Sequence, residues 1–217
     1  MNIKNQSDFK GISFEKEDNS YIAPTWQEMG EYCFGLAQKI IQKKLKFDRL
    51  VTLAKGGWTW SRTMTDLLHI DKVASVQIEF YTRVGKVGEK PVLVQSLPVE
   101  IGNERILVFD DVVDTGKSLP FCKQYLQMCG AKSITTASLF YKPWAEFIPD
   151  FYMCQTKAWI IFPHEVREAI YDLTSKWLEN GFNFGQIKDR FAKIGLPKRE
   201  VNFFTDVIFN GNAKKTK

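Results

Sequence analysis

The sequence has few residues of the kinds that build disulfide frameworks and zinc sites. It contains 4 cysteines and 2 histidines in 217 residues, and no two cysteines form a CxxC pair. The segment HEVRE, which begins at His164, lacks the second histidine of the HExxH zinc-protease motif. The sequence therefore argues against disulfides, a structural zinc site and a zinc protease, and we expect the cysteines to be small buried hydrophobic residues.

Long hydrophobic runs are also missing. No window approaches the roughly 20 apolar residues of a membrane helix. The polar first 20 residues lack the apolar centre of a secretory signal, so we expect a cytoplasmic protein. A composition of 44% hydrophobic and 25% charged residues is typical of a globular protein with one substantial core.

The positive charge is unevenly distributed. The formal net charge is +5, and residues 184–217 carry eight lysines and arginines against three acidic residues, which accounts for the whole surplus. We therefore expect any basic surface to lie mainly in this C-terminal part.

Helical and strand patterns alternate through the first three quarters of the chain. They predict helices at 23–45, 59–70 and 117–130, and strands at 49–54, 73–82, 105–110, 133–141 and 158–162. Such alternation implies right-handed crossovers and a parallel sheet. Residues 83–91 contain two glycines, a proline and four charges, which predicts a loop. Residues 1–20 are expected to form a mobile arm or an extended edge segment.

Beyond residue 165 the pattern is helical only, with predicted helices at 165–181, 184–195 and 197–209. We therefore expect a first domain at 1–165 and a C-terminal helical extension at 166–217. Its phenylalanines need burial, which favours packing on the core or on an oligomer partner. Three short basic helices also match a helix-turn-helix reader of DNA, but packing is favoured and nucleic acid is not an expected partner.

Three carboxylates crowd the stretch ILVFDDVVDTGKSLPF, residues 106–121. They are Asp110, Asp111 and Asp114. A P-loop would require glycine at position 111, so that interpretation fails. The segment DTGKS opens a helix and offers backbone N–H groups to one phosphate, while the acids before it suit sugar hydroxyls or Mg²⁺. Together these features predict a ribose 5-phosphate site.

The same stretch resembles the phosphoribosyl pyrophosphate (PRPP) signature of the type I phosphoribosyltransferases. VTLAKGGW resembles the pyrophosphate loop of that family, and FYTRVGKVGEKP lies where the family has its flexible catalytic loop. LFYKPW and AWIIFPHE resemble the purine-contacting segments of the hypoxanthine and xanthine-guanine members. The resemblance spans residues 25–165 and implies an α/β fold: a Rossmann-like parallel-sheet core with a small hood, followed here by the helical extension.

The resemblance also implies the residues that bind PRPP. They are Lys55, Gly56, Gly57, Asp110, Asp111, Asp114, Thr115, Gly116, Lys117 and Ser118. Asp110 and Asp111 bind the ribose hydroxyls and help to place Mg²⁺, and Asp114 is the general acid and base near purine N7. The segment from Thr115 to Ser118 surrounds the 5-phosphate. The pyrophosphate loop contacts the leaving group, and the family often has a cis peptide before its basic residue.

Four further residues are implied to contact the purine: Lys142, Trp159, Ile160 and Glu165. Lys142 donates to the 6-oxo group, Trp159 stacks on the ring and the Ile160 backbone contacts the 2-position. A solvated lysine and a core tryptophan are the alternatives, and the surrounding motifs favour the functional roles. His164 stands where members often have tryptophan, which leaves the preference between guanine and xanthine open.

The resulting expectation is an Mg²⁺-dependent purine phosphoribosyltransferase, a homodimer or homotetramer active in purine salvage. It transfers the 5-phosphoribosyl group of PRPP to hypoxanthine, guanine or xanthine, and gives a nucleoside monophosphate and pyrophosphate. Lys142 argues against adenine, whose 6-amino group is itself a donor. The alternative is a regulator that senses PRPP or a nucleotide in the same pocket and binds nucleic acid through its basic tail.

Overall fold

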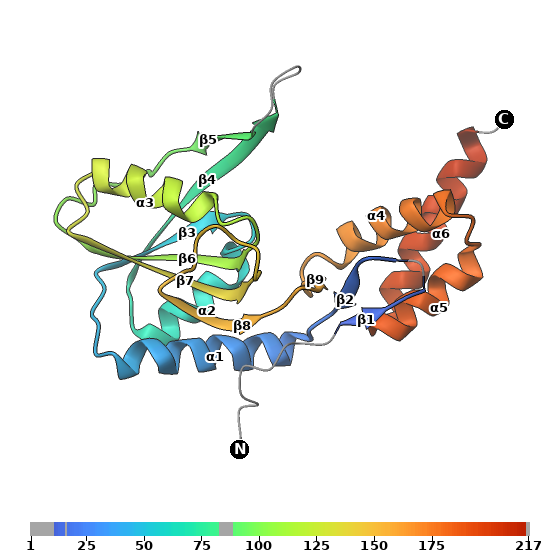
Figure 1. Ribbon diagram of the computed structural model, residues 1–217, viewed down its shortest axis with the longest axis horizontal. Helices are drawn as coiled ribbons and strands as arrows, with labels where there is room; N and C mark the ends of the chain where they lie inside the picture. Colours follow the sequence, from blue (N-terminus) through green and yellow to red (C-terminus); the bar gives the residue numbers. More distant parts are fainter. Residues whose placement is uncertain (1–10, 16, 83–88, 216–217) are drawn as a thin grey trace. The chain divides into compact units, whose positions relative to one another are not determined.

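A computed structural model describes residues 11–15, 17–82 and 89–215 (Figure 1). The chain divides into two compact units. The first contains Met29–Thr156, and the second contains the described parts of Phe9–Glu28 and Lys157–Lys217. The domain ranges expected from the sequence, 1–165 and 166–217, stay a prediction.

The first unit is built on a six-stranded sheet in the order β5-β4-β3-β6-β7-β8. The bounds are β3 Arg49–Ala54, β4 Lys72–Thr82, β5 Glu89–Gln95, β6 Arg105–Val113, β7 Ser133–Tyr141 and β8 Phe151–Gln155. Every neighbouring pair is parallel except β4 and β5, which are antiparallel. The expected α/β class with a mainly parallel sheet is confirmed.

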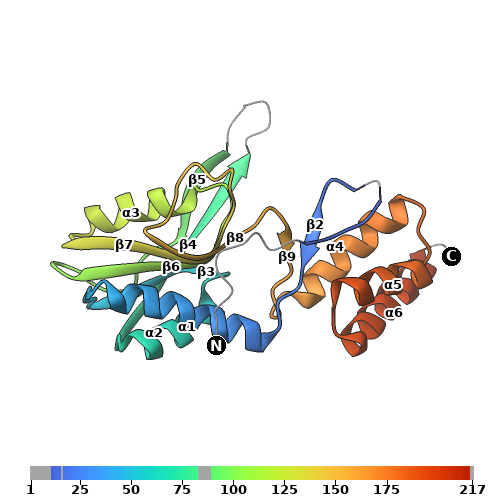
Figure 2. The ribbon, with the colours of Figure 1, turned by 60° about the horizontal axis from the view of Figure 1, so that its bottom comes forward.

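Helices cover both faces of this sheet. Helices α1 (Trp26–Gln42) and α2 (Trp58–Leu68) lie on one face, and α3 (Ser118–Met128) lies on the other (Figures 1 and 2). Because the central strands are covered on both sides, the apolar runs of β3 and β6 are almost continuously buried. A capping box begins α1: Thr25 N donates to Glu28 Oε2 at 2.7 Å, and Glu28 N donates to Thr25 Oγ1 at 3.2 Å.

Two strands of this sheet, β5 and β8, were not predicted from the sequence. Residues 89–91, predicted as loop, begin β5, an antiparallel edge strand. Its proline and charges are tolerated because an edge strand leaves one row of backbone groups outside the ladder. The short strand β8 has no clear alternation. Residues 83–88, the rest of the predicted loop, lie outside the described part of the chain.

The second unit combines a small sheet with three helices. The strands β1 (Ile12–Ser13), β2 (Ser20–Ile22) and β9 (Trp159–Ile160) pair in the order β1-β2-β9. The helices are α4 (Val166–Glu179), α5 (Phe184–Ile194) and α6 (Lys198–Lys215). Residues 1–20 were expected to form a mobile arm or an extended edge segment. The extended alternative is correct at residues 12–13 and at residue 20, which lie in strands.

The core of the second unit draws on all three helices. Tyr21, Trp177 and Phe191 are fully buried together, with Val201 of α6 packed beside them. Phe191 is buried in this core. Phe203 and Phe209 on α6 are 62% and 55% exposed in the single chain, so the expected burial of the C-terminal phenylalanines on the core or on an oligomer partner stays a prediction. Thr205 takes the buried side of that helix.

Three of the four cysteines are buried, as expected, and Cys129 is half-buried. Among the residues that the structure describes, no helix has the length and apolar character needed to cross a membrane.

Candidate active site

The three carboxylates lie where β6 ends and the chain turns towards α3. Asp110 and Asp111 are still on the strand, and Asp114 follows its last residue. Open parallel sheets bind ligands beyond the carboxyl ends of their strands, so these residues stand at the expected edge. Asp111 is buried and Asp110 is half-buried, whereas Asp114 is exposed.

Burial dominates the electrostatics of the first two acids. It raises the pKa of Asp111 to about 6, against the opposing effect of a hydrogen bond from Val112 N to Asp111 Oδ1 at 2.7 Å. Burial, followed by the charge of Asp111, also raises the pKa of Asp110 well above its ordinary value. These two neighbouring carboxylates therefore resist full ionisation on their own and would ionise more readily beside a cation.

The segment after Asp114 forms a tight turn. Gly116 has φ +81°, and a Cβ atom at this position would meet Phe147 N at 2.5 Å. The turn is fixed by a hydrogen bond from Glu146 N to Thr115 O at 2.9 Å. Helix α3 begins at Ser118 without a side-chain cap. The N–H groups of its first turn can therefore bind an anion such as one phosphate group.

The predicted pyrophosphate loop lies against the end of β6. A Cβ atom on Gly56 would meet Asp111 Oδ1 at 2.5 Å, and one on Gly57 would meet Thr52 Oγ1 at 2.3 Å. Glycine is therefore needed at both positions because neighbouring atoms fill the space. The Ala54–Lys55 peptide bond is cis, as the family resemblance implies, and the Lys55 side chain is exposed.

A third group of side chains follows β7. Lys142 is buried, and burial lowers its pKa while the charge of Asp114 opposes that shift. Its Nζ lies 5.5 Å from the ring centroid of Trp144, whose Nε1 donates to Asp114 Oδ1 at 3.1 Å. Trp144 thus connects two predicted site residues. Trp144 was not among the residues expected from the sequence, although it stands two positions after Lys142 in the motif LFYKPW.

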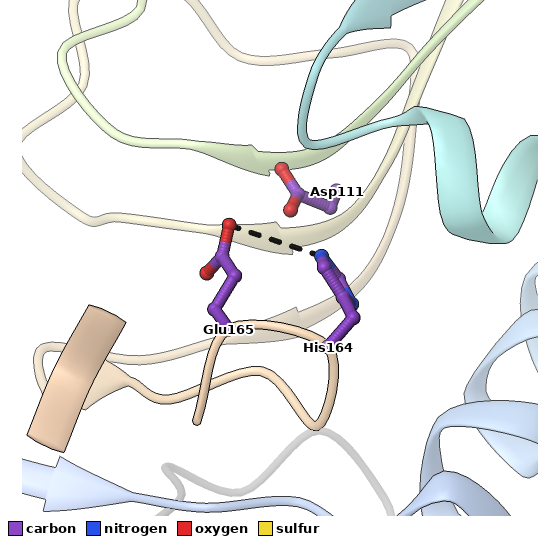
Figure 3. Close-up of side chains that lie close together, drawn as sticks. All are labelled: Asp111, His164 and Glu165. Atoms are coloured by element: carbon purple, nitrogen blue, oxygen red, sulfur yellow. Dashed lines mark ion pairs between the residues drawn. The ribbon is translucent and has the colours of Figure 1, made fainter. Parts of the chain in front are cut away.

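The remaining predicted purine contacts belong to the second unit. Trp159 is 37% exposed and Ile160 is buried, both on β9. Figure 3 shows the segment after β9, where His164 Nε2 lies 3.8 Å from Glu165 Oε1, and it also labels Asp111 of β6. His164 stacks on Phe162 with ring centroids 5.5 Å apart. Burial lowers the pKa of His164, so its imidazole is neutral at pH 7 and the pair has little ionic character.

The carboxylates of β6 fit the Mg²⁺ ion that the resemblance implies. Hard carboxylate oxygens are the ligands that Mg²⁺ prefers. The raised pKa values of Asp110 and Asp111 show that their charge is poorly compensated within the protein. A divalent cation would supply that compensation, so these two residues are the ones that would hold it.

Comparisons with known proteins agree with the fold and the motifs described above. The model of the phosphoribosyl transferase domain family matches residues 25–169. The structure of a purine phosphoribosyltransferase from Pyrococcus horikoshii is 33% identical, with a TM-score of 0.60, and the match covers 67% of this chain and 93% of that one. No curated protein matches the sequence.

Two further solved structures share the fold. A hypothetical protein from Neisseria gonorrhoeae with bound ppGpp is 25% identical, with a TM-score of 0.62, and the match covers 69% of this chain and 91% of that one. A xanthine-guanine-hypoxanthine phosphoribosyltransferase from Helicobacter pylori is 23% identical, with a TM-score of 0.59 and coverage of 71% and 99%. The family match over residues 25–169 shows that the chain belongs to the phosphoribosyl transferase domain family, which implies an enzyme of the glycosyltransferase type.

Proposed function

We propose that this protein is a 6-oxopurine phosphoribosyltransferase. It joins hypoxanthine, guanine or xanthine to the 5-phosphoribosyl group of PRPP and releases pyrophosphate. The observation that carries the proposal is the group formed by Asp114, Trp144 and Lys142. Asp114 follows β6, the strand that carries Asp110 and Asp111, and the buried Lys142 follows the neighbouring strand β7. A carboxylate and a buried ammonium, the two groups that a 6-oxopurine needs, therefore stand at the ends of adjacent strands.

Three segments of the chain bind different parts of PRPP. Asp110 and Asp111 accept hydrogen bonds from the ribose hydroxyls. The turn from Thr115 to Ser118 and the first turn of α3 donate N–H groups to the 5-phosphate. Lys55, exposed beside Gly56 and Gly57, contacts the pyrophosphate. An Mg²⁺ ion held by Asp110 and Asp111 would supply positive charge that stabilises the leaving pyrophosphate.

The reaction exchanges one bond at the anomeric carbon for another. The bond from this carbon to pyrophosphate breaks and its electron pair leaves with pyrophosphate, while a purine nitrogen forms the new bond. Positive charge develops on the ribose ring in the transition state, and the nearby carboxylates stabilise it. Asp114 accepts the proton that the purine loses, with one carboxylate oxygen held by the Trp144 N–H.

Base selection rests on the donor at position 142. Lys142 donates to a 6-oxo group, and its burial strengthens this charged hydrogen bond. Adenine would place its amino donor against the same ammonium, so it is a poor substrate. Trp159 is the proposed stacking residue, the Ile160 backbone contacts the 2-position, and Glu165 is the remaining purine contact. We also propose that the enzyme acts in purine salvage as a cytoplasmic homodimer or homotetramer.

The proposal is tested by comparing acceptors. The protein is incubated with PRPP and Mg²⁺ together with hypoxanthine, guanine, xanthine, adenine or orotate, and nucleotide formation is followed for each. We expect turnover with at least one 6-oxopurine and little with adenine or orotate. Turnover only with adenine or orotate would show that the base-contacting residues are assigned wrongly.

A second candidate is a regulator that binds a purine nucleotide in the same pocket. The observation that favours it is the Neisseria gonorrhoeae relative, whose structure holds ppGpp, together with the basic C-terminal part of this chain. Such a protein would bind DNA or RNA strongly, with a steep dependence on salt, and the binding would respond to PRPP or nucleotide. Nucleic-acid binding of this kind without catalysis would favour the regulator.

A further inference from the structure

The strand that carries Trp159 has little support of its own. Strand β9 has two residues and pairs with β2, and with no other strand in the described part of the chain. The register places Trp159 opposite Tyr21 and Ile160 opposite Ile22. One further backbone bond, from Ile161 N to Ile22 O at 2.8 Å, continues the pairing. The position of Trp159 therefore depends on how β2 is held.

Tyr21 connects this pair of strands to the interior of the second unit. Its ring is fully buried and lies 5.8 Å from the Trp159 ring, centroid to centroid. Its hydroxyl donates to Glu17 Oε2 at 2.6 Å. The Tyr21 ring thus contacts Trp159 on one side while its hydroxyl is fixed by a carboxylate.

Glu17 is in turn fixed by the C-terminal helices. Its Oε1 accepts hydrogen bonds from Trp177 Nε1 at 2.8 Å and from the Arg190 guanidinium. Both members of the Glu17–Arg190 ion pair are buried. Hydrogen bonds from Tyr21, Trp177 and Arg190 therefore hold both oxygens of this carboxylate.

The guanidinium of Arg190 is held by aromatic rings as well. Its central carbon lies 4.0 Å from the ring centroid of Phe14, 4.7 Å from that of Trp177 and 4.3 Å from that of Phe182. Three rings around one guanidinium restrict its orientation by cation–π contact and packing. A continuous series of contacts therefore runs from helix α5 through Glu17 and Tyr21 to the Trp159 ring.

The N-terminal segment packs tightly against the backbone beside β9. A Cβ atom on Gly11 would meet the Cβ atoms of Ala158 and Ser20 at 2.8 Å. The N-terminal segment thus packs against the residue that precedes Trp159, and only glycine allows this approach.

We propose that the C-terminal helices position Trp159 for purine binding, through Arg190, Glu17 and Tyr21. The inference rests on the proposed function, because it concerns the ring that stacks on the purine. Helix α5, Glu17 and Tyr21 all lie outside residues 25–169, the part that matches the family. Purine affinity in this protein consequently depends on segments that the family match does not include.

The experiment is steady-state kinetics on the full-length protein with Glu17→Gln and Tyr21→Phe variants. Glu17→Gln removes the charge that pairs with Arg190, and Tyr21→Phe removes one hydroxyl while keeping the ring. We expect the KM for the purine to rise about tenfold in Glu17→Gln, which corresponds to about 1.4 kcal/mol, and less in Tyr21→Phe. The KM for PRPP and the kcat should stay unchanged in both.

A matched control separates positioning from general destabilisation. Val201→Ala removes buried carbon atoms from the same core without changing any residue of the series. It should lower the Tm and leave the purine KM unchanged. In a Trp159→Ala background, Tyr21→Phe should have no further effect on the purine KM, because Tyr21 acts through the Trp159 ring.

The outcomes distinguish this inference from the proposed function. An active wild-type protein whose purine KM is unchanged in both variants, or changes equally in Val201→Ala, overturns the positioning role alone. An additive effect of Tyr21→Phe on Trp159→Ala also overturns it. A wild-type protein without turnover on any 6-oxopurine overturns the proposed function itself.

Discussion

Replacing Gly56 with alanine tests the contact between the pyrophosphate loop and the β6 carboxylates. The added Cβ would lie 2.5 Å from Asp111 Oδ1, 2.7 Å from Oδ2 and 2.8 Å from Cγ. Ordinary contact begins near 3.4 Å. The carboxylate and the loop must therefore separate by about 0.9 Å, the difference between 3.4 Å and 2.5 Å.

A displacement of this size is large for a catalytic group. A misplacement of about 1 Å lowers rates by roughly 100-fold in enzymes whose reacting groups are held in fixed geometry. We therefore expect Gly56→Ala to lower kcat/KM for PRPP by about 100-fold. This corresponds to about 2.7 kcal/mol of transition-state stabilisation.

The assay is steady-state kinetics with PRPP varied at saturating purine, accompanied by thermal unfolding. Gly30→Ala is the matched control, because it adds the same methyl group within α1 where no other atom lies within 4 Å. Alanine is favoured over glycine inside a helix by about 0.8–1.0 kcal/mol, so the control should be stable and fully active. An unchanged kcat/KM in a folded Gly56→Ala protein would refute the proposed role of this contact.

Three further predictions concern other groups. Asp114→Asn should lower kcat by about 10²–10⁴-fold with little change in the KM for PRPP. Trp144→Phe, which loses the indole hydrogen bond and keeps a smaller aromatic ring, should lower kcat less. Equal rates for wild type and both variants would remove Asp114 from proton transfer. Lys142→Met should raise the KM for guanine by roughly 10- to 150-fold, because it loses a charged hydrogen bond of about 1.5–3 kcal/mol. A KM at the wild-type value would refute the contact between Lys142 and the 6-oxo group. Burial, followed by the hydrogen bond to the Glu17 carboxylate, raises the pKa of Tyr21 above its ordinary value of 10.0. The protonated hydroxyl therefore stabilises the fold below pH 10, and this stabilisation is lost as the pH rises above that value. Urea unfolding at increasing pH should therefore show a steeper alkaline loss of stability for wild type than for Tyr21→Phe, and parallel curves would contradict this reasoning.

Local signals were sufficient for the central strands and for the PRPP segment. Strands β3 and β7 have the predicted bounds because their apolar runs are flanked by polar turns. The candidate residues from Asp110 to Ser118 could be named because one contiguous stretch contains both the carboxylates and the helix start. In such cases the chemistry and the geometry are both local.

Contacts between distant residues could not be predicted in this way. Glu17 and Arg190 are separated by 173 positions, and neither lies in a motif. The Trp144–Asp114 bond spans 30 positions and depends on the chain path after β7. Edge strand β5 was missed because its environment, not its composition, makes it a strand. A single sequence contains the side chains of these contacts but no direct information on their pairing.

The most direct test of the central claim follows both products of one reaction. Nucleoside monophosphate and pyrophosphate are measured together after the wild-type protein is mixed with PRPP, Mg²⁺ and hypoxanthine, guanine or xanthine. We predict equal amounts of the two products with at least one of these purines, and loss of both in Asp114→Asn. A folded protein that forms no nucleoside monophosphate from any of the three would contradict it.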